Sequence, residues 1–276
     1  MTREPRLLVI GHLAKDQMRH GFTTGGTAAY AALTAVRMGF TVAVVTSAGP
    51  DLDPETELPG VRVHVVPSAE STVFVNDYGP DARIQTVKGV AAPITVTDFP
   101  PALRSATAVL LGPLVGEVGA GVRGVVQGSV VMASLQGWLR AWDERGRVRP
   151  VSWDGTGLLP QVDAAIASAD DVLEEALFEP WSEMVPVLIV TEGSRGARIN
   201  VAGRWNRVEP FRSQEVDPTG AGDVFAAAYL LRFCETRDPL VSARFASCAA
   251  GLSVEAEGVE GIPTRSQIED RLSHGP

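Results

Sequence analysis

The segment 216–231 (VDPTGAGDVFAAAYLL) combines residue types that could hold and attack a phosphate group. Three small residues, Gly220, Ala221 and Gly222, precede an apolar run of helix-forming composition, and Asp223 lies at its start. The first N–H groups of a helix lack intrahelical partners, and the helix dipole is positive there. Because no bulky side chain intervenes, a phosphate could approach this backbone closely.

Asp223 is the residue that separates catalysis from simple anion binding. A carboxylate beside a phosphate repels it, so phosphate binding alone does not favour an acid at this position. The acid is useful if it accepts the proton of a hydroxyl group that attacks the phosphate, the task of the base in phosphoryl transfer. The alternative is that Asp223 only stabilises the helix N-terminus, an effect of about 0.3–1 kcal/mol.

The stretch DPTGAGDVF resembles the C-terminal signature of the PfkB family of carbohydrate kinases, with Pro218 where threonine is usual. The resemblance implies that Asp223 is the catalytic base and that the backbone of Gly220, Ala221 and Gly222 forms an anion hole. It places Thr219 in the nucleotide site. It also implies ATP as the phosphate donor and Mg²⁺ as its counter-ion.

The resemblance extends to an acceptor site near the N-terminus. Gly11 ends an apolar run, Asp16 follows, and Gly25 and Gly26 open an Ala-rich stretch. In the family the acid binds acceptor hydroxyls and the glycines let the acceptor lie against backbone; a carboxylate can accept two such hydrogen bonds. Thr27 stands where asparagine is frequent, so the acceptor's identity stays open. The alternative for Asp16 is a solvated loop acid.

A second acceptor segment is Ser134–Arg140 (SLQGWLR), which resembles Asp-x-Asn/Gln-Gly-x-x-Arg with Ser134 in place of the acid. It implies that Gln136 and Arg140 bind the acceptor. Arg140 could face the transferred phosphate or simply form a surface ion pair. Together with residues 71–74 (STVF), this pattern resembles the branch of the family that contains inositol kinases.

The donor site is implied by Thr191–Gly196 (TEGSRG), which resembles Thr-x-Gly-x-x-Gly at a strand end. Thr191, Gly193 and Gly196 would then line the nucleotide; the alternative is a plain turn into the next hairpin.

The segment Ser168–Asp171 (SADD) stands where the family has Asn-x-x-Glu, and both ends are altered. The resemblance implies that Ser168 binds the nucleotide. Asp171 is the candidate metal residue, since carboxylates suit hard cations such as Mg²⁺, directly or through water.

A parallel sheet covered by helices must position these residues. Strand-like apolar runs alternate with helix-like segments, a pattern typical of α/β proteins. The expected strands are 6–11, 41–46, 106–111, 130–134, 164–168 and 187–191, and the expected helices are 25–39, 220–233, 239–255 and 264–272. With the resemblance, the fold class is a ribokinase-like three-layer α/β/α sandwich with a mostly parallel central sheet and a small β lid.

The lid is expected within a single kinase domain spanning 1–276. Residues 61–66, 71–78 and 83–90 are β-rich, and the last two flank GPDA, a turn sequence. Only 13 residues separate Gly11 from Gly25, so we expect the lid mainly from about 71–90, with 12–24 as a lesser contributor. A second hairpin is expected from 197–210. An exposed lid sheet could also pair two subunits as a homodimer.

Composition excludes several classes of function. The 24 basic and 33 acidic residues give a net charge of −9, which argues against binding to nucleic acid or an anionic membrane. Neither lysine, Lys15 or Lys88, follows a glycine, so there is no Walker A loop. Two cysteines and a short N-terminal apolar run predict a cytoplasmic protein. The GAGVRG stretch at 119–124 lies mid-chain, outside the context of a dinucleotide fingerprint.

These observations together predict an ATP-dependent kinase that phosphorylates a hydroxyl of a small sugar or an inositol-like cyclitol. One alternative is a nucleoside kinase of the same family, because the motif does not name the acceptor. The other is a non-catalytic ligand-binding or regulatory protein on the same fold, which Ser134 and the altered 168–171 segment favour.

Overall fold

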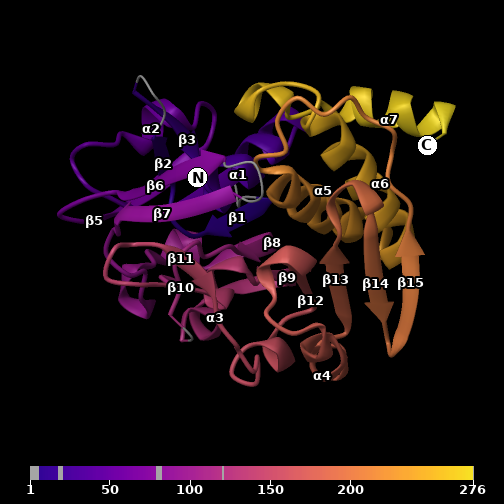
Figure 1. Ribbon diagram of the computed structural model, residues 1–276, viewed down its shortest axis with the longest axis horizontal. Coiled ribbons are helices and arrows are strands. Elements are labelled where there is room, and N and C mark those ends of the chain that lie inside the picture. The colour runs from indigo at the N-terminus through magenta and orange to yellow at the C-terminus, as the bar shows by residue number, and fades with distance from the viewer. Residues whose placement is uncertain (1–5, 18–20, 79–82, 120, 276) are drawn as a thin grey trace.

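A computed structural model describes residues 6–17, 21–78, 83–119 and 121–275, and a central sheet carries the fold (Figure 1). Within the described residues its strand order is β15–β14–β13–β12–β9–β8–β1–β4–β5. The strands are β1 (Leu7–Ile10), β4 (Val42–Ala48), β5 (Arg62–Pro67), β8 (Ser105–Leu111), β9 (Gln127–Ser134), β12 (Ala164–Ser168), β13 (Val187–Thr191), β14 (Ala197–Val201) and β15 (Arg204–Val208). Neighbours are parallel except β13–β14 and β14–β15, which confirms the predicted mostly parallel sheet.

Side chains of the central strands alternate between two apolar cores. Leu7 and Val9 face one core, and Leu8 and Ile10 face the other. Successive side chains of a strand point to opposite faces of its sheet, so each strand contributes to both cores. Both faces are covered, and this is why the strands read in the sequence as continuous apolar runs.

Long helices cover one face of the sheet, and short ones cover the other. The long helices are α1 (Thr27–Arg37), α5 (Ala221–Thr236), α6 (Pro239–Ser253) and α7 (Arg265–His274). Helix α5 packs against α1, α6, β8 and β9. The opposite face carries α3 (Val122–Val125), α4 (Phe178–Met184) and several 3₁₀ turns, and Figure 1 shows these two groups of helices on opposite sides of the strands. A further short helix, α2 (Pro54–Glu57), follows β4. Within the described ranges, no helix is long and apolar enough to cross a bilayer.

A second sheet lies at one end of the molecule, at the left of Figure 1. This small sheet has the order β3–β2–β6–β7, with β3 (Phe22–Gly25), β2 (Ala14–Gln17), β6 (Thr72–Tyr78) and β7 (Arg83–Gly89). The GPDA turn between β6 and β7 lies outside the described residues. The stretch between Gly11 and Gly25 supplies β2 and β3, because a four-residue strand needs only about 13 Å.

One local prediction differs from the structure, and one short strand pair was not predicted. Residues 61–66, grouped with the small sheet, instead pair as β5 along β4 at the edge of the central sheet. A short antiparallel pair, β10 (Arg140–Trp142) and β11 (Val148–Pro150), carried no recognisable strand pattern.

A buried glutamate joins the loops that follow β1 and β8. Glu117 is 4% exposed, and its carboxylate accepts backbone N–H groups of His12 at 2.8 Å, Leu114 at 2.9 Å and Val115 at 2.8 Å. Both carboxylate oxygens are used, so the side chain replaces the water that these amides would otherwise bind.

The buried imidazole of His12 links the same place to the small sheet. Its Nε2 lies 3.0 Å from the carbonyl oxygen of Ala92, which can only accept, so Nε2 carries the proton. Its Nδ1 lies 2.8 Å from the Thr72 hydroxyl oxygen, and that oxygen accepts the N–H of Ala91. The chain entering β2, the start of β6 and the segment after β7 thus meet at one buried polar cluster.

Replacing Glu117 with glutamine should destabilise the fold. The amide NH₂ would face backbone N–H groups that need an acceptor, which leaves a buried donor unsatisfied at a cost of about 2–4 kcal/mol. Urea unfolding of Glu117→Gln measures this loss, with the exposed Glu183→Gln as the matched control, expected to stay within about 0.5 kcal/mol. Equal stability of the two variants would contradict the role of Glu117.

Candidate active site

The predicted catalytic residues converge at the carboxyl ends of the parallel strands. The chain leaves β15 at this edge, so α5 begins there and Asp223 lies in its first turn. Burial is the main reason that the pKa of Asp223 is raised to about 6. The negative charges of Asp171 and Asp16 raise it further, whereas a hydrogen bond from Thr27 and the positive charge of Arg140 lower it. Five residues from separate elements therefore form one electrostatic cluster, here called the acid cluster.

The start of α5 needs a glycine for steric reasons. Gly220 is the N-cap with φ 78°, and a Cβ there would lie 2.2 Å from atoms of the Tyr30 ring. Gly222, by contrast, faces open space. A ligand could therefore approach the helix start at Gly222, whereas the N–H of Ala221 donates to the carbonyl oxygen of Pro218 at 3.3 Å.

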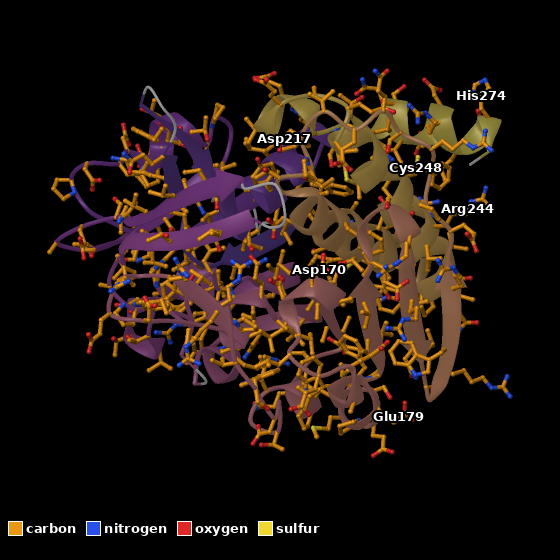
Figure 2. The ribbon with its side chains drawn as sticks, in the orientation of Figure 1. Asp170, Glu179, Asp217, Arg244, Cys248 and His274 are labelled. Carbon is orange, nitrogen blue, oxygen red and sulfur yellow. The ribbon has the colours of Figure 1, made fainter. Side chains whose placement is uncertain are left out.

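The loop before α5 is held by Asp217, a residue that the sequence analysis did not select. Its carboxylate accepts the N–H of Thr219 and the N–H of Gly258, both at 2.9 Å. The N–H groups of Val216 and Asp217 both donate to the carbonyl oxygen of Val254. Figure 2 shows Asp217 beside the C-terminal helices. The sequence could have indicated this role, because Asp217 is the first acid of the DPTGAGD segment.

Thr27, the first residue of α1, has a fully buried hydroxyl oxygen. This oxygen makes no hydrogen bond of ordinary geometry within the described chain, yet it interacts with Asp223 strongly enough to lower the pKa of that carboxyl group. The hydroxyl is therefore close to the predicted base.

Asp171 holds both residues of the predicted Gln136/Arg140 pair. Gln136 Nε2 donates to its Oδ2 at 3.0 Å, and Arg140 Nη2 donates to its Oδ1 at 3.1 Å. The side chains of Arg140 and Asp171 are 13% and 17% exposed, so this ion pair lies inside the site and not on the open surface. Figure 2 labels the neighbouring Asp170 near the middle of the view.

These contacts bear on the predicted metal site. Both Asp171 oxygens already accept hydrogen bonds, which disfavours direct coordination of Mg²⁺. In the part of the chain that the structure describes, no three metal-ligating side chains cluster together. The donor set of the described residues therefore does not fit a metal held directly by side chains at this site.

Asp16 reaches the site from β2, and its carboxylate lies over Gly25. A Cβ at Gly25 would be 2.1 Å from Asp16 Oδ2, so glycine is required for this approach. Asn76 Nδ2 donates to Asp16 Oδ1 at 3.1 Å, and Gln85 Nε2 donates to Asn76 Oδ1 at 3.0 Å. Gly26, the N-cap of α1, follows directly. Neither Asn76 nor Gln85 belongs to a motif, and nothing in the sequence alone singled them out.

The predicted donor residues lie along the same edge. Ser168 and Thr191 are paired in register at the ends of β12 and β13. Gly193 begins a 3₁₀ turn that ends at Gly196, with φ values of 58° and 87°. Ser168 is joined to the acid cluster through the short turn that carries Asp171.

The adjoining Glu192 forms ion pairs with Arg198 at 2.7 Å and Arg207 at 3.4 Å, so it braces the hairpin that follows.

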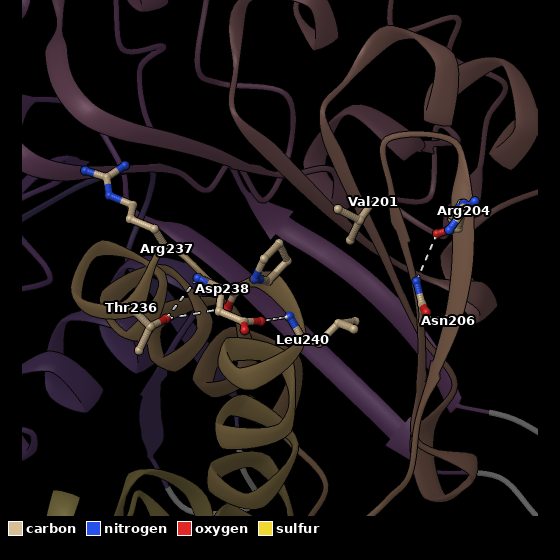
Figure 3. A pocket seen from close by; sticks show the side chains of 8 residues that line it. Val201, Arg204, Asn206, Thr236, Arg237, Asp238 and Leu240 are labelled. Atoms are coloured by element: carbon tan, nitrogen blue, oxygen red, sulfur yellow. Dashed lines mark hydrogen bonds between the residues drawn. The ribbon is translucent and has the colours of Figure 1, made fainter.

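Neither of two cavities elsewhere in the molecule contains a predicted site residue. One of about 590 Å³ lies between the β14–β15 hairpin and the turn joining α5 to α6, lined by Arg204, Asn206 and Asp238 among others (Figure 3). It opens at the sheet edge opposite Asp223, because β14 and α5 both end there. The other, of about 140 Å³, lies beside the stacked rings of Trp138 and Trp153.

Comparison with known proteins agrees with this fold. Residues 162–265 match the model of the pfkB family carbohydrate kinases. Ribokinase of Bacillus subtilis (strain 168) is 40% identical over 87 residues, which cover 31% of this chain and 30% of the relative. Inositol 3-kinase of Oryza sativa subsp. japonica is 33% identical over 144 residues, which cover 49% of this chain and 34% of the relative. The chain thus spans about a third of the length of these curated relatives.

A solved structure matches over nearly its whole length. It is a pyrophosphate-dependent kinase in the ribokinase family, complexed with a pyrophosphate analog and myo-inositol. The TM-score is 0.80 at 21% sequence identity, and the match covers 96% of this chain and 99% of that chain. The chain therefore has the ribokinase-like fold, and its residues 162–265 match the pfkB family of carbohydrate kinases.

Proposed function

We propose that this protein is a kinase that transfers a phosphoryl group to a hydroxyl of a small sugar or cyclitol. The carrying observation is Asp223 in the first turn of α5, behind a glycine helix start, with its pKa raised to about 6. A carboxyl group with a pKa close to neutral is a stronger base than a solvated aspartate and is still mostly ionised at pH 7.

The geometry supports a division of labour among the acid cluster. Asp16, over Gly25, accepts hydrogen bonds from acceptor hydroxyls, and Thr27 orients the hydroxyl that reacts. Asp223 takes the proton of that hydroxyl as its oxygen forms a bond to phosphorus and the bond to the leaving phosphate breaks. The N–H groups of Gly220–Gly222 donate to the transferred phosphoryl oxygens, whose charge they stabilise.

The phosphate donor binds along the ends of β12 and β13. We propose ATP with Mg²⁺, contacted by Ser168, Thr191, Gly193, Gly196 and Thr219. Mg²⁺ bound to the donor would neutralise phosphate charge, and Asp171 acts chiefly by holding Gln136 and Arg140. Pyrophosphate is the alternative phosphate donor, because the solved kinase described above depends on pyrophosphate.

Two alternative functions can be distinguished by the activity assay described below. A nucleoside acceptor would be bound through its ribose hydroxyls by Asp16. A non-catalytic binding protein would retain the fold without turnover, although an aspartate whose pKa is raised by desolvation is typical of functional sites. A homodimer through the small sheet and a cytoplasmic location both stay predictions.

The first test is a donor-by-acceptor panel. Mg²⁺–ATP and pyrophosphate are each combined with sugars, inositols and nucleosides, and ³¹P NMR detects the phosphorylated product. We expect acceptor-dependent turnover that falls about 10²–10⁴-fold in Asp223→Asn, since general-base catalysis contributes a factor of this size. Asp270→Asn, an exposed acid on α7, is the matched control and should keep full activity. Tight acceptor binding with no turnover under either donor would favour the non-catalytic alternative.

The second test is the pH dependence of kcat/KM. Only ionised Asp223 can accept the proton, so the rate should fall below about pH 6 with a single acid limb. In Asp171→Asn the limb should move to lower pH, because the charge of Asp171 raises the pKa of Asp223 and its removal also frees Arg140. A limb that stays in place in this variant would speak against the acid cluster.

The third test separates catalysis from stability. The pKa of Asp223 is higher in the folded chain than its ordinary 3.8, so ionising it costs folding free energy. That cost is absent below about pH 4 and complete above about pH 6, where it amounts to at most about 3 kcal/mol. Asp223→Asn should therefore unfold at a higher temperature than wild type at pH 8, and the difference should vanish at pH 4. An unchanged or lower melting temperature at pH 8 would contradict the buried ionised acid.

A further inference from the structure

Helix α1 packs against α5 and contacts the start of that helix at two points (Figure 1). At the first point, the Thr27 hydroxyl lies close enough to Asp223 to lower the pKa of that carboxyl group. At the second, the Tyr30 ring lies against Gly220, where an added Cβ would be 2.2 Å from two ring carbons. Residues three apart lie on one face of a helix, so the same face of α1 makes both contacts.

Tyr30 is held between two segments that lead into the predicted anion hole. It is 4% exposed and belongs to the apolar core that contains α5. Its ring meets Gly220, and its hydroxyl oxygen lies 3.8 Å from the position that a Cβ on Gly258 would take. The N–H groups of Gly258 and Thr219 both donate to the Asp217 carboxylate. The turn before α5 is therefore bounded by the Tyr30 ring and tied by Asp217.

The Gly220 turn determines where the first N–H groups of α5 point. Gly220 has φ 78°, a left-handed conformation, and its carbonyl oxygen accepts the N–H of Val224 at 2.9 Å. Gly222 faces open space, so a phosphate can approach the backbone there. A glycine has no side chain that could anchor this turn. The three atoms nearest to the Cβ position of Gly220 all belong to the Tyr30 ring, so this ring sets the position of the turn.

From these contacts we propose that Tyr30 is a positioning residue whose ring fixes the anion hole at the start of α5 relative to the acceptor end of α1. The inference rests on the proposed kinase function and adds the group that aligns the two reactants. Tyr30 is buried, so it acts through Gly220 and not by touching a substrate.

The alignment matters because the two helices hold different reactants in the proposed reaction. The acceptor lies at Gly26 and Thr27 on α1, whereas the transferred phosphoryl group and the base Asp223 lie at the start of α5. The attacking oxygen must be in line with phosphorus and the leaving group, and a misplacement of about 1 Å costs about 10²-fold in rate. A side chain smaller than Tyr30 would leave space into which the Gly220 turn relaxes.

The test compares three variants of the full-length chain with wild type. Tyr30→Leu removes the ring, and Tyr30→Phe keeps it. Phe233→Leu is the matched control, because it also replaces a core ring with leucine, but about 15 Å along α5 from Asp223. If Tyr30→Leu does not fold, Tyr30→Met is measured in its place, since the flexible methionine side chain fills irregular space.

Two properties are measured for each variant. The first is kcat and the acceptor KM, with the donor and acceptor that the panel identifies. The second is the affinity for inorganic phosphate without acceptor, followed by the amide resonances of Gly222 and Asp223, which report binding at the start of α5. The melting temperature of each variant is recorded alongside.

We expect kcat of Tyr30→Leu to fall about 10–100-fold with an acceptor KM within about twofold of wild type, since the acceptor end of α1 is unchanged. Its phosphate Kd should rise about tenfold, the effect of weakening one hydrogen bond to a charged group. Tyr30→Phe and Phe233→Leu should stay close to wild type in both properties. A merely structural role would lower the melting temperatures of the two leucine variants alike and leave kcat per folded molecule unchanged.

The inference is overturned if Tyr30→Leu keeps the wild-type kcat and phosphate affinity, or if Phe233→Leu or Tyr30→Phe shows the same loss as Tyr30→Leu. It is also overturned if phosphate leaves the Gly222 amide resonance of wild type unchanged. Failure of the proposed function looks different: wild type then binds phosphate at Gly222 but phosphorylates no acceptor, and the phosphate titration alone decides the role of Tyr30.

Discussion

The site depends on keeping an ionised carboxylate at a partly buried helix start. Asp223 lies where burial disfavours its charge, with two other acids close enough to disfavour it further. The N-terminus of α5 and the Arg140 guanidinium oppose these effects only in part. The surrounding fold therefore has to supply the free energy, and it does so through the apolar packing of α5 on α1, α6 and the central sheet.

In the proposed reaction, the position of the acceptor relative to Asp223 depends on how the two sheets are aligned. The central sheet carries Asp223 through α5, whereas Asp16 belongs to the small sheet. The buried cluster of Glu117, His12 and Thr72 joins the two at the point where the chain passes between them. A displacement of this cluster would move Asp16 relative to Asp223, and small displacements of reacting groups are costly in phosphoryl transfer.

The sequence predicted the elements that have a local pattern or a motif. It did not predict the roles of residues that depend on contacts between distant segments. Buried parallel strands and the α5 start are local patterns, so both were found. Val61–Val66 was assigned to the wrong sheet, because β propensity does not say which neighbour a strand pairs with. Glu117, Asn76 and Gln85 look like ordinary polar residues, and only their partners, many positions away, show their roles.

The net negative charge of the chain has a different consequence at the candidate active site. A net charge of −9 with two lysines looks unfavourable for handling phosphate. Asp171 pairs with Arg140 and so cancels part of the positive charge that would otherwise lower the pKa of Asp223. A fully available arginine would make Asp223 a weaker base, whereas the pair leaves it stronger. In the proposed kinase the acidic surroundings would thus favour proton abstraction, and phosphate binding would fall to backbone N–H groups, which carry no net charge.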